Sequence, residues 1–445
     1  GLRWRAPNYL GQDKALGYKS SAFLASPELK TRVQFWIDIY SKYPSSQGVL
    51  HDRSDLNLVY EVLDFTSLLS NTSLNIYQVE KAKDIVVKKK REEVLDRLNR
   101  LKAYKTSDGL SGEDLRYWNL FPPANREAAL RLASDKEAIR FQLGQKDYFQ
   151  KGIYYSGRYM KQMEKIFREE GVPIELTRLP FVESSFNIFA RSKVGASGIW
   201  QFMRNTGKSY MKVNAQVDER NDPLVSSRAA ARLLRSNYRN LNSWPLAITA
   251  YNHGPSGMKR LMREFNTTEI HELIEKVQRG RFGFASKNFY ACFLAALEVE
   301  SNADKHFGNV EIASALPFEV YVLPKNANYK LLLKAFGSDA IKTELLNPQF
   351  TSLVKRGRLP MPKGSQIRLS PRETEKFASL ISVKQKKEDE ADLGKVSPYK
   401  VAMGDSLYSI AQTFGVTVQT LIDRNSIDNP RMLRTGQTLF IPVQD

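Results

Sequence analysis

Apolar residues recur at helical spacing through the first two-thirds of the chain. Trp36 and Tyr40, and later Leu56, Val59 and Leu63, lie three or four positions apart. Such spacing places apolar side chains on one face of a helix, whereas the alternating positions that predict strands are scarce here. The pattern therefore predicts a mainly helical fold for this part of the chain.

The last third of the chain has a different pattern. Short β-like segments at 318–323 and 366–369 lie around one helical stretch, and a charged run follows at 384–390. Residues 399–443 then have the pattern of strand, helix, helix and strand. Because charged runs of this kind are typical of solvated linkers, we predict small α+β modules of βααβ type joined by a linker.

These changes of pattern divide the chain into five segments. They are an N-terminal helical region (1–136), a larger helical domain (137–308), a small α+β module (315–371), a linker (372–396) and a C-terminal module (397–445). At roughly 100–200 residues per domain, the length predicts about three structural units.

The charge balance narrows the choice of partners. The chain carries 67 Lys and Arg against 48 Asp and Glu, a formal net charge of +19. Such a charge attracts polyanions, including nucleic acid, acidic membrane surfaces and anionic cell-wall polymers. Since neither a paired Cys/His spacing nor a basic-aromatic strand pattern accompanies it, we expect no nucleic-acid partner.

Composition also limits the chemistry. With one cysteine, Cys292, and four histidines, the sequence has no internal disulfide to form and too few ligands for a Cys- or His-rich metal site. We expect no metal and no cofactor, with Cys292 as a small core residue and His253 as a loop residue. No stretch approaches the roughly 18 apolar residues of a membrane-spanning helix.

One carboxyl group is distinguished by its neighbours. Glu183 directly follows the apolar run at 179–182. A carboxyl group held against apolar side chains loses solvation in its charged form, so its pKa rises. An acid that stays protonated near neutrality can protonate the leaving oxygen of a glycosidic bond. A glutamate at a helix end facing solvent is the plainer interpretation of the same residue.

The sequence that follows favours the chemical interpretation. A loop of Gly, Ala and Ser at 192–198 lets the backbone approach a ligand closely. The sequence also contains polar and apolar side chains of the kind that bind sugars, namely Gln201, Met203, Tyr251 and Asn252.

Three spaced motifs carry a resemblance to a known family. Glu183–Phe186, Gly195–Met203 and Ala250–Gly254 resemble, in this order, the catalytic signature of family 1 lytic transglycosylases. The resemblance covers about residues 137 to 305. It implies a lysozyme-like helical domain that cleaves the β-1,4 bond between N-acetylmuramic acid and N-acetylglucosamine in peptidoglycan.

The resemblance assigns the chemistry to Glu183 alone. As an acid, Glu183 would protonate the glycosidic oxygen. As a base, it would then take the proton from the muramic acid's own 6-hydroxyl, which closes onto C1. The product would carry a 1,6-anhydro end, and no water would be consumed.

The resemblance also implies substrate-binding residues. Ser184 and Ser192 would be polar contacts near the acid and the N-acetyl group of the sugar. The sugar subsites would be lined by Gln201, Met203, Tyr251 and Asn252.

One wall of the implied cleft departs from the family pattern. The motif Glu-Thr-x-x-Tyr-Val of many members corresponds here to Ala285–Tyr290, which lacks the acid and has Phe289 in place of the tyrosine. We expect Phe289 and the adjacent Tyr290 to contact the sugar at this wall.

Two other classes of function stay open. Ordinary glycosidases use two carboxylates. If Asp218, Glu219 or Asp222 positioned a water, the chain would be a hydrolytic muramidase like a goose-type lysozyme, or a chitinase-like enzyme. A turn that makes helix caps and salt bridges is the other interpretation of this acidic cluster. The second class is a non-catalytic wall-binding scaffold, against which the intact Glu183 argues.

The C-terminal module resembles a lysin motif (LysM) from Tyr399 to Pro442. In that family, N-acetyl sugars lie in a shallow groove between two loops, and a packing module without sugar affinity is the alternative. The groove residues implied here are Gly404, Asp405, Ser406, Leu407, Ile427, Asp428 and Asn429. Residues 315–371 resemble a degenerate unit of the same type, which we expect to act as a spacer.

These features predict peptidoglycan glycan strands as the partner. A glycan-binding module beside a glycan-cleaving domain raises the local concentration of cleavable bonds. The chain begins at Gly1 without an initiator Met, as an exported protein does once its signal is removed. We expect a periplasmic or cell-envelope location, with secretion, or membrane association through a missing N-terminal anchor, as alternatives. The sequence predicts no oligomeric state.

Overall fold

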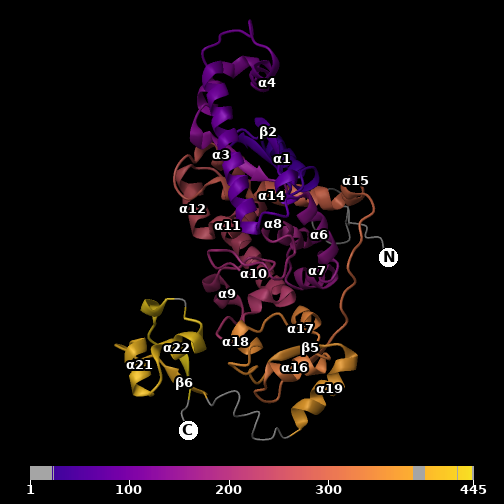
Figure 1. Ribbon diagram of the computed structural model, residues 1–445, viewed down its shortest axis with the longest axis vertical. Helices are drawn as coiled ribbons and strands as arrows, with labels where there is room; N and C mark the ends of the chain where they lie inside the picture. The colour runs from indigo at the N-terminus through magenta and orange to yellow at the C-terminus, as the bar shows by residue number, and fades with distance from the viewer. Residues whose placement is uncertain (1–22, 24, 384–395, 428, 443–445) are drawn as a thin grey trace. The chain divides into compact units, whose positions relative to one another are not determined.

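The computed structural model describes residues 23, 25–383, 396–427 and 429–442 (Figure 1). They divide into two compact units. The first unit is formed by the described residues up to Phe186 together with Ala230–Ala313, and the second by Asn187–Ala229 and the described residues from Ser314 onward. Helix α10 (Pro223–Leu241) begins in the second unit and ends in the first.

The first unit is built around one enclosed helix, α14 (Phe284–Ser301). Most of its side chains are buried, and Phe293 and Val299 are fully so, which is the pattern of a helix covered on all sides. Three helices pack against α14, namely α1 (Lys30–Ser41), α8 (Leu179–Glu183) and α11 (Trp244–His253). Other helices of this unit are α6 (Lys146–Ser156), α7 (Met160–Glu169), α12 (Pro255–Glu264), α13 (Ile270–Lys276) and α15 (Ala303–Phe307). The helix that ends at Glu183 is therefore packed directly on the core.

Buried hydrogen bonds tie α1 to α14. Trp36 Nε1 and Arg32 Nη1 both donate to Asn288 Oδ1, at 3.1 and 2.9 Å. The Asn288 amide group donates in turn to Phe284 O at 2.9 Å, so both ends of this buried side chain are satisfied. The N-terminal region is thus part of the same packed unit as α14.

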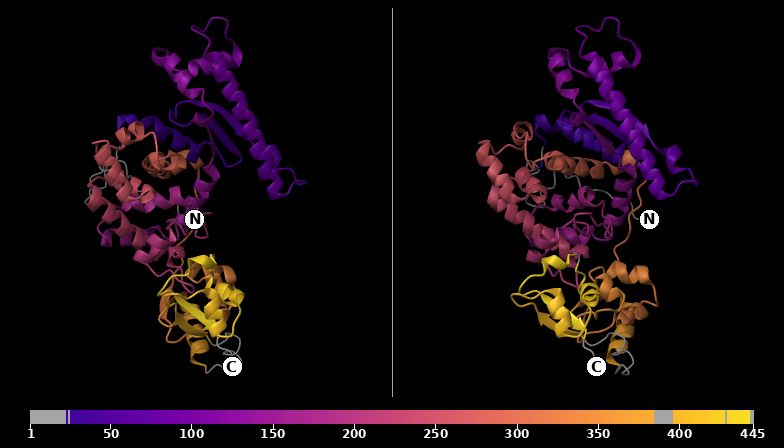
Figure 2. Two further views of the ribbon diagram at one scale, coloured as in Figure 1. Left: turned by 90° about the vertical axis from the view of Figure 1, so that its left-hand side faces the viewer. Right: turned by 60° about the vertical axis from the view of Figure 1, so that its left-hand side comes forward.

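A three-stranded antiparallel sheet completes the first unit. Its order is β2 (Val59–Asp64), β1 (Gln47–Asp52) and β3 (Ile139–Leu143). The long helix α3 (Ile76–Leu101) lies along the sheet and contacts β3, and it contributes Val94 and Leu98 to a shared core (Figure 2). The helices α4 (Gly112–Leu120) and α5 (Arg126–Ala133) contact α3.

The mainly helical fold class is confirmed, but the sequence analysis missed this sheet. Val59 and Leu63, which it assigned to a helix, lie on β2. A strand of six residues is too short for periodicity alone to separate it from a helical segment. In addition, β3 lies beyond residue 136, the expected domain boundary, and pairs with β1. The packing therefore does not break at that boundary.

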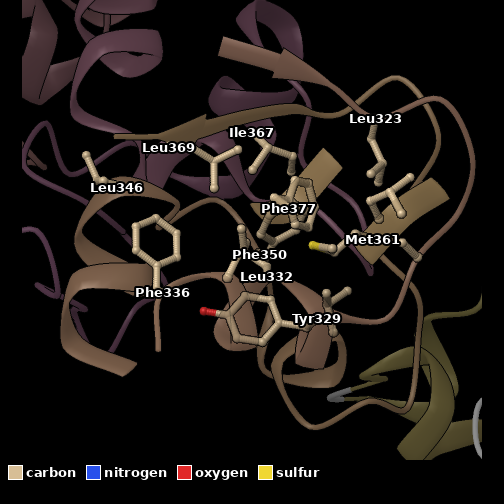
Figure 3. Close-up of a cluster of buried hydrophobic side chains, with 14 of the residues drawn as sticks. Leu323, Tyr329, Leu332, Phe336, Leu346, Phe350, Met361, Ile367, Leu369 and Phe377 are labelled. Carbon is tan, nitrogen blue, oxygen red and sulfur yellow. The ribbon is translucent and has the colours of Figure 1, made fainter. Parts of the chain in front are cut away.

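The second unit contains a module with its own hydrophobic core (Figure 3). Strands β4 (Glu319–Val322) and β5 (Gln366–Leu369) pair antiparallel. Between and after them lie α16 (Tyr329–Ala335), α17 (Ala340–Leu346), α18 (Ser352–Lys355) and α19 (Pro371–Ser382). Leu332, Phe350 and Phe377 meet in the interior. Because Phe377 belongs to α19, this helix is part of the module, although the sequence analysis placed it in the linker.

The C-terminal module has the predicted βααβ fold. Its elements are β6 (Val396–Lys400), α21 (Leu407–Thr413), α22 (Val418–Asn425) and β7 (Thr438–Pro442). The two strands pair antiparallel, and Leu407, Ile410 and Leu421 lie in a core beneath them.

Backbone hydrogen bonds join the first of these modules to the loop before α10. Asp218 N donates to Gln349 O at 2.7 Å, and Thr351 N donates to Gln216 O at 3.1 Å. Val217, between the two bonded loop residues, is buried in the module's core. Loop and module therefore pack as one body.

An ion pair reinforces this junction. Arg368 Nη1 lies 2.6 Å from Asp222 Oδ2, and both side chains are largely buried. The other oxygen of Asp222 accepts hydrogen bonds from Leu224 N at 2.9 Å and Val225 N at 3.1 Å, which caps α10. Removing one partner of a buried pair typically costs about 3–5 kcal/mol, because the other charge stays buried.

We predict that Arg368→Met lowers the free energy of unfolding by about 3 kcal/mol, because Asp222 loses its cation in a buried position. Urea unfolding followed by circular dichroism measures the difference. Arg372→Met, which removes an exposed charge on α19, is the control and should cost less than about 0.5 kcal/mol. Equal stability of the two variants would contradict a role for the ion pair.

Candidate active site

Glu183 is the last residue of α8, a short helix that directly follows the 3-10 turn Ile174–Arg178. The fully buried Arg178 fixes this segment. Its Nε donates to both carboxylate oxygens of Glu300 on α14, at 3.1 and 2.9 Å, and its Nη1 donates to Glu164 Oε1 on α7 at 2.7 Å. Charge-assisted hydrogen bonds of this kind are strong and directional, so they hold the start of α8 between two other helices.

The turn after Glu183 has an unusual backbone. Ser185 and Phe186 have φ angles of 51° and 57°, in the left-handed region that residues other than glycine rarely adopt. The fold imposes this turn by packing. Phe186 is buried edge-on against Phe181, with ring centroids 4.7 Å apart, and Gly152 leaves so little room that a Cβ there would lie 2.9 Å from Ser185 O. Backbone strain held by packing is a frequent feature of functional sites.

The environment of Glu183 raises its pKa as the sequence analysis predicted. The side chain is only partly open to solvent, and burial raises the pKa of Glu183 to about 8. Burial, together with the negative charge of Glu183, also raises the pKa of Tyr251. A glutamic acid that is protonated at neutral pH can act as a general acid.

An aromatic wall lies on the two helices next to Glu183. The rings of Tyr251 on α11 and Phe289 on α14 are parallel, with centroids 6.3 Å apart. Asn252 Oδ1 accepts a hydrogen bond from Ser286 Oγ at 2.7 Å. Phe289 and Tyr290 are both buried, and Tyr290 packs toward Phe293. Of the two predicted residues on α14, Phe289 is therefore the one beside Tyr251.

The loop at 192–203, in the second unit, contains three other predicted residues. Ser192 Oγ accepts a hydrogen bond from Ala196 N at 2.9 Å. Gln201 Nε2 donates to Gly198 O at 2.8 Å, while Met203 is 44% exposed. The first two side chains stabilise the loop, and Met203 is the most accessible of the three. Ser184, in the first unit, donates to Pro180 O at 3.2 Å.

The acidic cluster at 218–222 is occupied by structural contacts. Asp218 pairs with Arg220 at 2.8 Å, Glu219 accepts a hydrogen bond from Lys212 N at 2.6 Å, and Asp222 caps α10. The observed contacts agree with the interpretation of this cluster as a turn of helix caps and salt bridges.

Comparison with known proteins identifies two domains. The family described as "Transglycosylase SLT domain" matches residues 162–274, and the LysM domain family matches residues 399–442. The chain contains a transglycosylase SLT domain and a LysM domain.

The chain is also similar to individual proteins over parts of its length. The chain is 27% identical over 301 residues to membrane-bound lytic murein transglycosylase D of Escherichia coli (strain K12), over 64% of this chain and 63% of the relative. It thus spans a little less than two-thirds of that relative's length. A segment of 48 residues is 46% identical to N-acetylmuramoyl-L-alanine amidase XlyA of Bacillus subtilis (strain 168), covering 11% of this chain and 16% of the relative. Among solved structures, the 70 kDa soluble lytic transglycosylase SLT70 of Escherichia coli aligns with a TM-score of 0.27 and 17% identity, over 66% of this chain and 54% of that one.

In the LysM domain, the predicted groove residues mainly shape the first turn. Gly404 has a φ of 89°, and Asp405 Oδ2 accepts hydrogen bonds from Tyr399 Oη at 2.7 Å and Ala402 N at 2.8 Å. Ser406 caps α21, while Leu407 is a core residue. Ile427 packs against the same core and Asn429 caps a 3-10 turn. Asp428 lies outside the described residues.

Sequence reasoning missed the arginine that organises the loop Gly195–Phe202 of the SLT domain, here called the SLT loop. Arg220 Nη1 donates to Gly195 O at 2.8 Å and to Phe202 O at 3.0 Å, and so joins the two ends of the loop that carries Gln201. Its position inside the acidic cluster at 218–222 was the available signal. Among the described residues, no group of three His, Cys, Asp or Glu side chains could hold a metal ion, and no described helix is long and apolar enough to cross a membrane.

We predict that Glu183→Gln makes the protein more stable at pH 9 and leaves its stability unchanged near pH 4.5. The folded-state pKa of about 8 exceeds the ordinary value of 4.5, so the folded protein binds more protons than the unfolded chain between these values. Wild-type stability therefore falls as pH rises through this window, whereas glutamine does not titrate. Allowing for partial exposure, the gain at pH 9 should be at least about 1 kcal/mol.

Thermal unfolding of both proteins at pH 4.5, 7 and 9 measures this effect. Glu264→Gln, at an exposed glutamate of α12, is the control and should follow the wild type at every pH. A stability difference between Glu183→Gln and wild type that did not vary with pH would contradict a raised pKa at Glu183.

Proposed function

We propose that this protein is a peptidoglycan lytic transglycosylase with Glu183 as its sole acid and base. It cleaves the β-1,4 bond between N-acetylmuramic acid and N-acetylglucosamine without water and leaves 1,6-anhydro ends. The observation that carries the proposal is a carboxyl group whose pKa burial raises to about 8, within the residues that match the SLT domain family, 162–274.

The reaction needs one group that first gives and then takes a proton. Protonated Glu183 donates to the glycosidic oxygen as the C1–O bond breaks. The resulting carboxylate then accepts the proton of the muramic acid's 6-hydroxyl, whose oxygen bonds to C1. Atoms and charge balance without a second carboxylate, and Asp218, Glu219 and Asp222 already have structural partners.

The remaining predicted residues have supporting roles in this proposal. Tyr251, Asn252, Phe289 and Met203 bind the sugars, whereas Ser192 and Gln201 keep the loop in shape. Ser184 and Tyr290 lie next to these groups in sequence, and their contacts with the sugar are part of the same hypothesis. The LysM domain holds the glycan strand through the turn at Gly404–Leu407 and the segment Ile427–Asn429, and the expected location is the periplasm or cell envelope.

We predict that the wild type releases fragments from purified sacculi that lack one water at the muramic acid end and have no reducible terminus. Glu183→Gln should lower release at least about 100-fold, because general acid–base catalysis contributes roughly 100- to 10,000-fold, while sacculus binding is retained. Mass spectrometry of the soluble fragments, before and after borohydride reduction, gives both answers.

Glu219→Gln is the matched control, since a glutamine can still accept the hydrogen bond from Lys212 N. It should cleave like the wild type. Reducing-end products that disappear in Glu219→Gln would mean hydrolysis with a second carboxylate. Equal release by wild type and Glu183→Gln would favour a non-catalytic scaffold.

We predict that kcat/KM on soluble glycan strands falls above pH 8, approaching tenfold per pH unit, because Glu183 must be protonated to donate. Binding of the same strands to Glu183→Gln, measured over the same pH range, separates loss of catalysis from loss of binding. A rate that stayed constant up to pH 10 would contradict an acid with a pKa of about 8.

A further inference from the structure

A cavity of about 540 Å³ lies in the first unit, between α1 and the N-terminal end of α14. Three cationic side chains line it: Arg32, Arg53 and Lys287. Other residues of its lining are Ser54, Glu137, Glu275, Phe284 and Asn288. A volume of this size is in the usual range for small-molecule sites.

The three cations have no carboxylate partner in the described part of the chain. Arg32 donates to the neutral oxygens of Asn288 at 2.9 Å and Ser54 at 3.2 Å, and Lys287 Nζ donates to Val277 O at 2.5 Å. Neutral acceptors orient these groups without cancelling their charge. The two carboxylates of the lining, Glu137 and Glu275, belong to exposed residues and form no salt bridge with the three cations. Burial lowers the pKa of Arg32 and has a larger effect than the charges of Asp55 and Glu275, which raise it.

The charges also act on one another. Burial, followed by the positive charges of Arg32 and Arg53, lowers the pKa of Lys287. Arg140 adds a fourth cation beside the cavity, with its guanidinium carbon 3.7 Å from the centroid of the Phe284 ring. Burial and the charge of Arg53 lower the pKa of Arg140 to about 10. An anion bound here would relieve this mutual repulsion.

Two further features of the cavity suit an anion. Asn288, which orients Arg32, is 1% exposed and hydrogen-bonded at both ends, so the site is pre-organised. Helix α14 has 18 residues and begins at Phe284 after Gly283, without a side-chain cap. The amide groups and the dipole at such a helix start favour negative charge.

The cavity adjoins the proposed sugar wall on the same helix. Phe284, Lys287 and Asn288 line it, at helical spacings of three and four. Ser286 and Phe289, on the neighbouring face of the same turns, contact α11 through Asn252 and Tyr251. A glycan strand on that wall would bring its attached peptides close to the three cations.

We propose that this cavity is a carboxylate-binding subsite for the stem peptide of the peptidoglycan strand. The identity of the ligand rests on the proposed function, and the site itself rests on the cluster of cations without carboxylate partners. Its consequence is specificity: strands that carry peptides are bound and cleaved in preference to bare glycan. Within the segment Ala285–Phe289, the acid of the family motif is replaced by Ala285, and Lys287 and Asn288 occupy the two positions that the motif leaves open.

The first test compares kcat/KM on peptide-bearing glycan strands with that on the same strands stripped of peptides by an amidase. The double variant Arg53→Gln/Lys287→Gln should lose at least about tenfold on peptide-bearing strands, mainly through KM, because two charge-assisted contacts are removed. On bare strands it should stay within twofold of the wild type. A double variant of exposed cations on α12, Lys259→Gln/Arg263→Gln, should match the wild type on both.

Equal losses on the two substrates, or no loss on either, would overturn the proposal. Arg53→Gln alone keeps the test valid if the change at Lys287 unfolds the protein. Arg53 is exposed, and its side chain makes no hydrogen bond among the described residues. The single variant should show the same selective loss, at about threefold or more.

The second test does not need turnover. Calorimetry on Glu183→Gln measures binding of an N-acetylmuramyl peptide with free carboxylates and of the same peptide with its carboxylates amidated. We expect the free acid to bind at least about tenfold more tightly, and Arg53→Gln/Lys287→Gln in the same background to abolish this preference. If the free acid bound more tightly than the amidated peptide but the wild type did not cleave glycan, the subsite would stand and the proposed function would be rejected. Cleavage without discrimination would reject the subsite alone.

Discussion

The location of Glu183 depends on one buried guanidinium group. Arg178 is fully enclosed, and carboxylates from α14 and α7 meet it at 2.9 and 2.7 Å. A charge in such a position is unfavourable unless it is paired and hydrogen-bonded. The main effect of this network is to fix the position of α8, since well-packed apolar side chains could stabilise the core equally well. Because Arg178 immediately precedes α8, the network fixes the start of the helix whose last residue is Glu183, the proposed acid.

A second arginine has the equivalent role in the other unit. Arg220 is held by Asp218 and donates to backbone oxygens at both ends of the loop Gly195–Phe202. The same stretch of chain is bonded through Asp218 N to the module that contains Gln349. The conformation of the SLT loop is thus linked by direct contacts to residues more than 100 positions later. A module that the sequence suggested as a spacer is therefore packed against a part of the SLT domain.

The sequence allowed some of these features to be predicted, for reasons that differ from residue to residue. The raised pKa of Glu183 could be foreseen because its apolar neighbours are adjacent in the chain. The small C-terminal fold could be foreseen because its strands and helices follow each other locally. Arg178 could not, because its partner Glu300 is distant in sequence. Arg220 is close to its partner Asp218 in the chain, but only the fold shows that it also joins the backbone oxygens of Gly195 and Phe202. The sheet was missed because β1 and β2 are short and because β3, the second partner of β1, lies beyond residue 136. The cationic cavity needed three segments, around Arg32, Arg53 and Lys287, that only the fold brings together.

The raised pKa of Glu183 also bears on why a single acid can suffice. In the proposed reaction the same carboxyl group must donate a proton in the first step and accept one in the second. A glutamate with an ordinary pKa of 4.5 would be almost wholly ionised at neutral pH and would rarely be ready to donate. With a pKa of about 8, the group is mostly protonated at rest, and its carboxylate is a stronger base once the proton has left. Proton transfer in both directions is best served by a pKa near the working pH. The burial that keeps Glu183 protonated therefore serves both half-reactions.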